Sequence, residues 1–320
     1  MPSIVYSPNY NITFGGIELL HPFDSRKYGR AWKVLRDHFG ERLLTWSLAP
    51  SRAVNDDELL TVHSAAYLER LKQSEYVSRA LEIPVVRYLP NWVIDWRVLR
   101  PMRWATMGTV VAAREAIRNG FAVNLGGGFH HAKPDSGEGF CVYSDIALAV
   151  RSLRQEGLLA DASKVVYVDL DAHQGNGVCH QFMHDRTVLI FDQYNSSIYP
   201  SHDTEAAARI DCAVPLTSGC KQSQYMGELR DRLPNFLDSI SGTEPIAFAI
   251  YNAGTDVYRG DPLGALGVGP AGILERDLLV VQELRQRGIP TVMVLSGGYT
   301  RLSYQLVADS VIELLEREAV

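Results

Sequence analysis

The sequence predicts an α/β fold in which helices cover both faces of an open parallel β-sheet. Short β-branched runs recur along the 320 residues, and each ends in a loop that contains Gly, Asp or Asn, as buried parallel strands do. Between these runs the apolar residues have helical spacing, and a glycine follows the last turn, where a left-handed cap is expected. Strands and helices that alternate in this way form right-handed crossovers in one sheet.

This pattern places five strands and three helices. The strands are expected at residues 122–125, 165–170, 188–191, 246–251 and 291–295, and the helices at residues 102–119, 145–156 and 273–287. Residues 81–101 contain three prolines and are expected to form an extended surface loop, suited to a substrate-binding lid or to irregular packing. No internal repeat or linker divides the chain, so we expect one domain over residues 1–320.

Composition argues against some classes of protein. The chain has 31 Lys and Arg against 37 Asp and Glu, a formal net charge of −6, and no run of five basic residues, so nucleic acid is not an expected partner. The amino terminus lacks a secretory pattern, and no apolar run reaches the roughly 18 residues of a membrane span. The four cysteines form no C-x-x-C pair, which favours reduced thiols and a cytoplasmic protein.

The strongest chemical motif follows the expected strand at residues 165–170. Asp169, Asp171 and His173 are spaced two residues apart, and alternate residues of a strand project to the same side. Carboxylate oxygens and imidazole nitrogens bind Zn²⁺ and similar divalent ions. The motif therefore predicts a metal site, with a polar strand end satisfied by loop amides as the alternative.

Three further motifs follow other expected strands. They are Gly126-Gly127-Gly128 before His130 and His131, Asp256 after the strand at 246–251, and Ser296-Gly297-Gly298-Tyr299 after the last strand. Taken alone, each is common turn material. Because open parallel sheets bind ligands at the carboxyl ends of their strands, four polar motifs at four strand ends predict one shared site.

Together the motifs resemble the histone deacetylase family, the zinc-dependent branch of the arginase/deacetylase fold. The matching stretches run from about Tyr6 to Tyr299 and include His21-Pro22-Phe23-Asp24. That segment and the motifs at 169–176 and 296–299 resemble the class IV branch more than class I. The resemblance implies a catalytic domain that removes acyl groups from lysine side chains of proteins or peptides, and class IV favours acceptance of long fatty acyl chains as well as acetyl.

The resemblance also implies metal ions. Asp171, His173 and Asp256 would bind one zinc ion, which would polarise the amide carbonyl and acidify its water. A potassium ion is implied beneath the site, with Asp169 among its ligands. That ion is less strongly expected, because Ile190 stands where relatives have a hydroxyl residue.

Catalytic roles follow from the same resemblance. His131 would take a proton from water and return it to the leaving amine, while His130, hydrogen-bonded to Asp169, would act as an electrostatic partner, with the division of roles between the rings left open. Tyr299 would donate to the developing oxyanion. Asn176 stands where class I enzymes have an aspartate, so the pKa of His131 is expected to be lower than in that class.

The implied substrate-binding residues are Gly128, Gly139, Phe140, Tyr199, Leu263, Ser296, Gly297 and Gly298. Among them, a group of four would form the wall of a narrow tunnel around the lysine stem: Gly139, Phe140, Tyr199 and Leu263. Ser296 replaces a third glycine of many relatives, and the sequence does not decide between a narrower pocket and an added hydrogen bond. Oligomeric state is likewise not indicated.

The sequence also bears on three other functions. A deacetylase of polyamines or other small acylated amines would need acidic residues at the rim, and Asp56, Asp57, Glu58 and Asp95 are loop acids that would serve, unless they are solvated surface charge. A binuclear manganese ureohydrolase is disfavoured because the second metal's ligands are not evident. A non-catalytic acyl-lysine-binding protein is disfavoured because every position assigned to the chemistry holds a competent residue.

Overall fold

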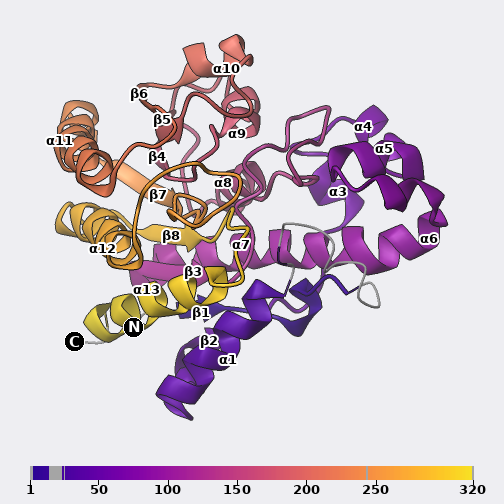
Figure 1. The fold of residues 1–320 in the computed structure, drawn as a ribbon, viewed down its shortest axis with the longest axis horizontal. Helices are drawn as coiled ribbons and strands as arrows, with labels where there is room; N and C mark the ends of the chain where they lie inside the picture. Colours follow the sequence, from indigo (N-terminus) through magenta and orange to yellow (C-terminus); the bar gives the residue numbers. More distant parts are fainter. Residues whose placement is uncertain (1–2, 14–23, 25, 243, 319–320) are drawn as a thin grey trace.

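Within the residues that the structure describes, eight parallel strands form one sheet (Figure 1). This computed structural model describes residues 3–13, 24, 26–242 and 244–318. In spatial order the strands are β2 (Ser47–Leu48), β1 (Ser3–Val5), β3 (Phe121–Asn124), β8 (Thr291–Val294), β7 (Ile246–Asn252), β4 (Lys164–Asp169), β5 (Val188–Asn195) and β6 (Cys212–Leu216). Every neighbouring pair is parallel, which confirms the predicted α/β fold class.

Helices connect the strands, as parallel pairing requires. The α-helices are α1 (Lys27–Phe39), α2 (Arg42–Trp46), α3 (Asp56–Leu59), α4 (Ala65–Arg70), α5 (Ser74–Ala80), α6 (Asn91–Ile94), α7 (Arg100–Asn119), α8 (Asp145–Gln155), α9 (Asn176–Gln181), α10 (Thr204–Arg209), α11 (Gln222–Ser241), α12 (Pro270–Gln286) and α13 (Ser303–Glu318). Short turns of other helix types are η1 (Pro8–Tyr10), η3 (Pro84–Tyr88) and η4 (Asp95–Leu99).

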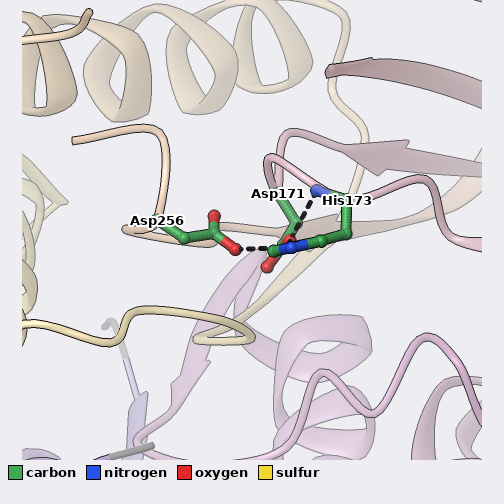
Figure 2. Close-up of side chains that lie close together, drawn as sticks. All are labelled: Asp171, His173 and Asp256. Atoms are coloured by element: carbon green, nitrogen blue, oxygen red, sulfur yellow. Dashed lines mark hydrogen bonds and ion pairs between the residues drawn. The ribbon is translucent and has the colours of Figure 1, made fainter. Parts of the chain in front are cut away.

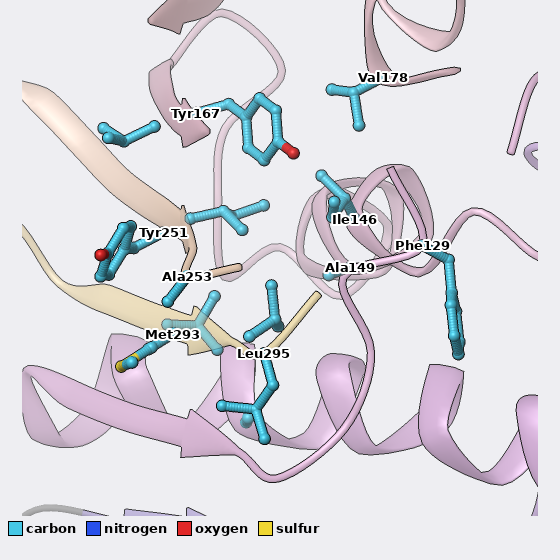
Figure 3. Packing of buried hydrophobic residues seen from close by; sticks show 14 of the residues in the cluster. Phe129, Ile146, Ala149, Tyr167, Val178, Tyr251, Ala253, Met293 and Leu295 are labelled. Carbon is cyan, nitrogen blue, oxygen red and sulfur yellow. The ribbon is translucent and has the colours of Figure 1, made fainter. Parts of the chain in front are cut away.

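Two groups of helices pack around the sheet (Figure 1). Helices α1, α13, α12 and α11 pack against one another in that order, while α7 packs on β1, β3 and β8 and against α8. Every residue of β3 and β8 is buried, as expected for strands covered on both faces. Figure 3 shows part of this core, in which Tyr167 points to the face of the sheet on which Ile146 and Ala149 of α8 lie. Tyr251 and Met293, which are paired in register, lie on the opposite face, where the Tyr251 hydroxyl donates to Asp277 of α12.

One expected element is wrong. Residues 81–101 are not an extended loop, because η3, α6 and η4 follow one another there and lead directly into α7. The prolines begin these turns: Pro84 lies in the first turn of η3, Pro90 is the N-cap of α6, and Pro101 lies in the first turn of α7. Proline is tolerated at a helix start because its missing N–H would have no partner there. The five strands and three helices placed by pattern are present, and none of their ends is shifted by more than four residues.

The register of the central strands determines where the loops meet. Asp169 of β4 is paired with Asn252 of β7, Asn252 is paired with Val294 of β8, and Met293 is paired with Val123 of β3. These pairs lie at the carboxyl ends of their strands, so the four following loops leave the sheet at one edge. This edge is where ligands bind in open parallel sheets.

Two global expectations concern membranes and thiols. Over the described part of the chain, no helix is both long enough and apolar enough to cross a bilayer. The cysteines are free thiols, at Cys141, Cys179, Cys212 and Cys220.

Candidate active site

Four loops at the carboxyl edge of the sheet carry the candidate site residues. The loop after β3 carries His130 and His131, the loop after β4 carries His173, the loop after β7 carries Asp256, and the loop after β8 carries Tyr299. The strand register starts these loops side by side. The structure thus brings together motifs that are up to 169 residues apart in the chain, from His130 to Tyr299.

Asp171, His173 and Asp256 form a buried group that could hold a metal ion (Figure 2). One ligand atom from each residue lies within 4.8 Å of the other two. The Nδ1 atom of His173 is 3.1 Å from an oxygen of Asp171 and 2.9 Å from an oxygen of Asp256. Both carboxylates are fully buried, so their charges need a partner in the interior.

Backbone amides and glycines hold these carboxylates in place. The second oxygen of Asp171 accepts the N–H of Gly297 at 2.8 Å, and the second oxygen of Asp256 accepts the N–H of Ala172 at 2.9 Å. A Cβ atom at Gly254 would lie 2.3 Å from Asp171. A side chain at that position would therefore displace a candidate ligand.

The charges of this group fit a divalent cation. Burial and the charge of Asp171 raise the pKa of Asp256 to about 7, because two carboxylates in one buried site repel each other. Although burial opposes it, hydrogen bonds to Asp171 and Asp256 raise the pKa of His173 to about 10. A divalent ion would replace the His173 proton and neutralise both carboxylates. Two carboxylates and one imidazole also match the donors of a catalytic zinc site.

His130 faces a carboxylate in the interior. Its Nδ1 atom lies 2.8 Å from Asp169, whose oxygens also accept the hydroxyl of Tyr167 at 2.6 Å and the amide of Asn252 at 2.9 Å. Although burial opposes it, the charges of Asp169 and Asp171 raise the pKa of His130 to about 9. In the metal-free chain His130 is therefore a cation at neutral pH.

His131, in contrast, faces an amide. Its Nδ1 atom lies 2.8 Å from Oδ1 of Asn176, the first residue of α9. Burial, together with the charges of His130 and His173, lowers the pKa of His131 well below its ordinary value. The ring is therefore neutral and has one nitrogen that can accept a proton, as a general base requires.

Asp145, which sequence reasoning missed, fixes the glycine turn that carries both histidines. Its buried carboxylate accepts the N–H groups of Gly128 and Phe129, each at 2.8 Å, and the hydroxyl of Thr109 at 2.6 Å. Gly127 has a φ of +72°, and a Cβ atom there would lie 2.3 Å from Asp145. Asp145 begins α8, where an acidic residue is common, so the sequence held no signal of this second role.

The structure resolves the open question about Ser296. Its hydroxyl donates to the carbonyl of Gly128 at 3.1 Å and accepts the amide of Asn252 at 3.0 Å. Ser296 itself has a φ of +45°, a conformation that favours glycine. The added hydroxyl therefore links the loop after β8 to the loop after β3 and to the end of β7.

A buried lysine was also missed. The Nζ atom of Lys27 in α1 donates to the carbonyls of Ser296 and Gly297 at 2.5 Å and 3.0 Å. Lysine is rarely fully buried, and burial lowers the pKa of Lys27 to about 8. Lys27 follows the motif that begins at His21, of which residues 21–23 lie outside the described residues.

Tyr299 lies beside the candidate metal ligands. Its backbone N–H donates to Asp261 at 2.7 Å, and its ring centroid is 6.0 Å from that of His173 and 5.9 Å from that of Phe140. Burial and the charge of Asp171 raise the pKa of Tyr299 well above its ordinary value. The phenol therefore keeps its proton and can act as a hydrogen-bond donor.

The remaining candidate substrate-binding residues lie on the same edge. Gly139 and Phe140 have φ values of +53° and +65°, and a Cβ atom at Gly139 would lie 2.4 Å from the ring of His131. The ring of Tyr199 is 5.1 Å from that of His131. Leu263 is half-buried in the loop after β7. That these residues surround an acyl-lysine tunnel stays a prediction.

Two of the acids considered for a polyamine site, Asp56 and Glu58, form ion pairs with arginines. Asp56 and Glu58 belong to α3 and Asp95 to η4, so they are not loop acids as expected. Asp56 forms an ion pair with Arg103, and Glu58 forms one with Arg52. These surface ion pairs account for the charges of Asp56 and Glu58, which favours the interpretation of these two acids as surface charge.

Comparison with known proteins agrees with the motifs and the fold. The chain is 42% identical over 320 residues to "Histone deacetylase 2" of Arabidopsis thaliana, covering 99% of this chain and 79% of that protein. The crystal structure of the "HDA15 HD domain" has a TM-score of 0.74 at 20% identity, covering 99% of this chain and 90% of that one. An HDAC homolog from Aquifex aeolicus gives a TM-score of 0.72 at 18% identity, covering 98% and 83%. At such identities the two structures support the fold alone.

A family model described as the histone deacetylase domain matches residues 21–315. The match spans all four loops of the candidate site, and the family is the one that the motifs resemble. The chain belongs to the histone deacetylase family.

Proposed function

We propose that this protein is a zinc-dependent hydrolase that removes acyl groups from lysine side chains. The observation that carries the proposal is the buried group of Asp171, His173 and Asp256, which lies next to one cationic and one neutral histidine. Family membership supports hydrolysis of acetylated lysine. The choice of zinc rests on the donor set.

Asp171, His173 and Asp256 would hold the metal. When bound, a zinc ion there supplies Lewis acidity to the amide carbonyl and lowers the pKa of water. Hydrolysis forms a bond between the water oxygen and the carbonyl carbon and breaks the bond from that carbon to the lysine nitrogen. The protein's own residues must therefore move one proton from water to the departing amine.

The two histidines and the tyrosine have different roles in this reaction. His131 is neutral, so its free nitrogen takes the proton from water and then protonates the amine. His130 is held as a cation by Asp169 and stabilises negative charge without transferring a proton. Tyr299 keeps its proton and donates a hydrogen bond to the carbonyl oxygen as that oxygen gains charge.

Finer assignments belong to the same proposal. The motifs around Asp169 and Ser296 support the class IV branch, and with it turnover of long fatty acyl chains as well as acetyl. A potassium ion beneath the site would use Asp169, although Ile190 supplies no hydroxyl. We place the protein in the cytoplasm as a single catalytic domain, on the composition and thiol content described above.

Two peptides test the proposal, one with acetyl-lysine and one with myristoyl-lysine. Zinc-loaded wild type should cleave at least one of them, and the ratio of the two rates gives the acyl preference. Tyr299→Phe should lower kcat by about 10²- to 10³-fold, as loss of one oxyanion donor does. Tyr88→Phe is the matched control, because Tyr88 is 73% exposed.

Acetylspermidine in a parallel assay separates the alternative substrate class. If wild type binds zinc and cleaves neither peptide but hydrolyses acetylspermidine, small acylated amines replace lysine as the substrate. If zinc binds and no acylated amine is cleaved, the hydrolase proposal fails.

A further inference from the structure

A cluster of charged side chains lies behind Asn176, on the side away from His131. The Nδ2 atom of Asn176 donates to Glu138 at 2.6 Å and to Asp203 at 3.0 Å. The Nζ atom of Lys133 joins the same two carboxylates, at 3.0 Å from Glu138 and 2.9 Å from Asp203. Two acidic side chains thus converge on one amide group.

The cluster links three segments of the chain. Lys133 and Glu138 belong to the loop that also carries His131, Asn176 begins α9, and Asp203 is the N-cap of α10. The side chain of Asp203 is 14% exposed and that of Glu138 is 31% exposed. Although burial opposes it, hydrogen bonds from Lys133 and Asn176 hold the pKa of Asp203 below its usual range. Asp203 therefore stays a carboxylate and can only accept hydrogen bonds.

The two ends of a side-chain amide differ chemically, and this difference determines the orientation of the Asn176 amide. Its Nδ2 end donates and its Oδ1 end accepts. If the amide were rotated by 180°, its oxygen would face two carboxylates, and neither could donate to it. Glu138 and Asp203 therefore select the orientation in which Oδ1 points at His131.

That orientation selects the tautomer of the ring. Because Oδ1 of Asn176 is an acceptor at 2.8 Å from Nδ1 of His131, this nitrogen must carry the proton. The other nitrogen, Nε2, is then left with its lone pair for the reaction. With the opposite orientation, Nδ2 of Asn176 would donate to Nδ1, and Nε2 would carry the proton.

We propose that Glu138 and Asp203 are positioning residues that orient the amide of Asn176 and thereby set the proton-accepting tautomer of His131. The proposal rests on the proposed function for the role of His131 as a base. It assigns a role to two acids that touch neither the candidate metal ligands nor the ring itself. Asn176 is the element through which they act.

The first test replaces both acids by amides of the same shape, in the variant Glu138→Gln with Asp203→Asn. Amide side chains can face Asn176 with either end, so the orientation is no longer selected. We expect kcat on the better acyl-lysine peptide to fall roughly 10- to 100-fold with KM nearly unchanged, as expected for an incorrect tautomer of a catalytic histidine. Asp185→Asn is the matched control, because Asp185 forms a similar half-buried ion pair with Arg154.

A second background separates positioning from simple stabilisation. In Asn176→Asp the group beside His131 is a carboxylate, which accepts from either oxygen and needs no orienting partner. There Glu138 and Asp203 only add repulsion, so the same double replacement should leave kcat unchanged or raise it. An equal fall of kcat in both backgrounds, or no fall in wild type, would overturn the proposal.

A readout independent of turnover keeps the two proposals distinguishable. In ¹⁵N-labelled protein, the ring of His131, assigned by its loss in His131→Gln, should show its proton on Nδ1 in wild type. The proton should move in part to Nε2 in the double replacement. If no peptide is cleaved but this shift occurs, the proposed function fails and the positioning role stands. A ring protonated on Nε2 in wild type would refute the positioning role.

Discussion

His130 and His131 are neighbours in the chain and opposites in their surroundings. Their ring centroids are 4.0 Å apart, and both side chains are buried. His130 meets the buried carboxylate of Asp169 directly, whereas His131 meets the neutral amide of Asn176. The pKa of the first ring is raised to about 9, and that of the second is lowered well below 6.5.

The difference shows how one turn can present two imidazoles with separate tasks. Two cationic rings at this distance would repel each other, and the charge of His130 is one reason why the pKa of His131 is lowered. Placing the carboxylate against one ring and an amide against the other therefore makes one ring a cation and leaves the other neutral, as the proposed general base must be. Residue type alone would not have separated them.

The largest expected effect comes from removing each ring in turn. We expect His131→Ala to lower kcat by about 10³- to 10⁴-fold, because it removes the proposed general base. His130→Ala should cost only about 10- to 100-fold, because it removes electrostatic stabilisation. Steady-state kinetics on the better acyl-lysine peptide, with zinc content measured for each variant, checks both. Equal losses, or a larger loss for His130→Ala, would reverse the assigned roles.

The fold class and the positions of the motifs could be predicted from the sequence, because both depend on local sequence features. The buried central strands β3, β4, β7 and β8 are short β-branched runs that end in polar loops, and these features are visible without tertiary contacts. The strands β1, β2 and β6, which lie outside the central group, were missed, because runs of two to five residues carry little periodic signal. Residues 81–101 were misjudged because proline both ends and begins helices.

Parts of the site were beyond reach for a different reason. Asp145, Lys27, Glu138 and Asp203 act on the site through contacts formed only when distant segments fold together. Each looks in the sequence like an ordinary surface or helix-end charge. Asn176 was noticed because it interrupts a recognisable motif, whereas the acids that orient it belong to no motif. Sequence patterns therefore identify the residues expected to contact the substrate more readily than the residues that position them.

The second expected effect is on the pH dependence of the free energy of unfolding, which compares the two rings without an activity measurement. In protein stripped of metal by a chelator, His130 has a pKa of about 9, against about 6.5 for an unfolded histidine. A raised pKa stabilises the fold fully below pH 6.5, and this contribution is lost as pH rises through 9. This stabilisation is at most about 3 kcal/mol, the free-energy equivalent of that pKa change. It arises from the interaction between His130 and Asp169, so it belongs to the pair and not to His130 alone.

Urea unfolding at several pH values between 6 and 9.5 measures this contribution. The free energy of unfolding of wild type should fall over that range by up to about 3 kcal/mol more than that of His130→Gln, which has no such charge to lose. The contribution of His131 has the opposite pH dependence. Its lowered pKa stabilises the fold above pH 6.5, and this stabilisation is lost as pH falls below that value. Parallel curves for wild type and His130→Gln would show that His130 is not charged in the folded chain.

The smallest expected effect concerns what the two rings share. Asp145 accepts the N–H groups of Gly128 and Phe129 and the hydroxyl of Thr109. In Asp145→Asn an amide NH₂ would face one of these donors, so a buried hydrogen bond is lost at a cost of about 1–3 kcal/mol in the free energy of unfolding. Thr109→Val is the graded comparison, at about 1 kcal/mol, because it removes one donor and leaves both backbone contacts.

The Asp145→Asn substitution should affect both histidines to the same extent, which makes it a test of their shared support. The turn at Gly128 carries both rings, so Asp145→Asn should lower kcat by a similar factor in wild type, in His130→Ala and in His131→Ala. The replacements of Glu138 and Asp203 differ, because they act through Asn176 and should lose their effect on kcat once His131 is absent. If Asp145→Asn also lost its effect in His131→Ala alone, the turn would serve one ring, and the two histidines would not share a support.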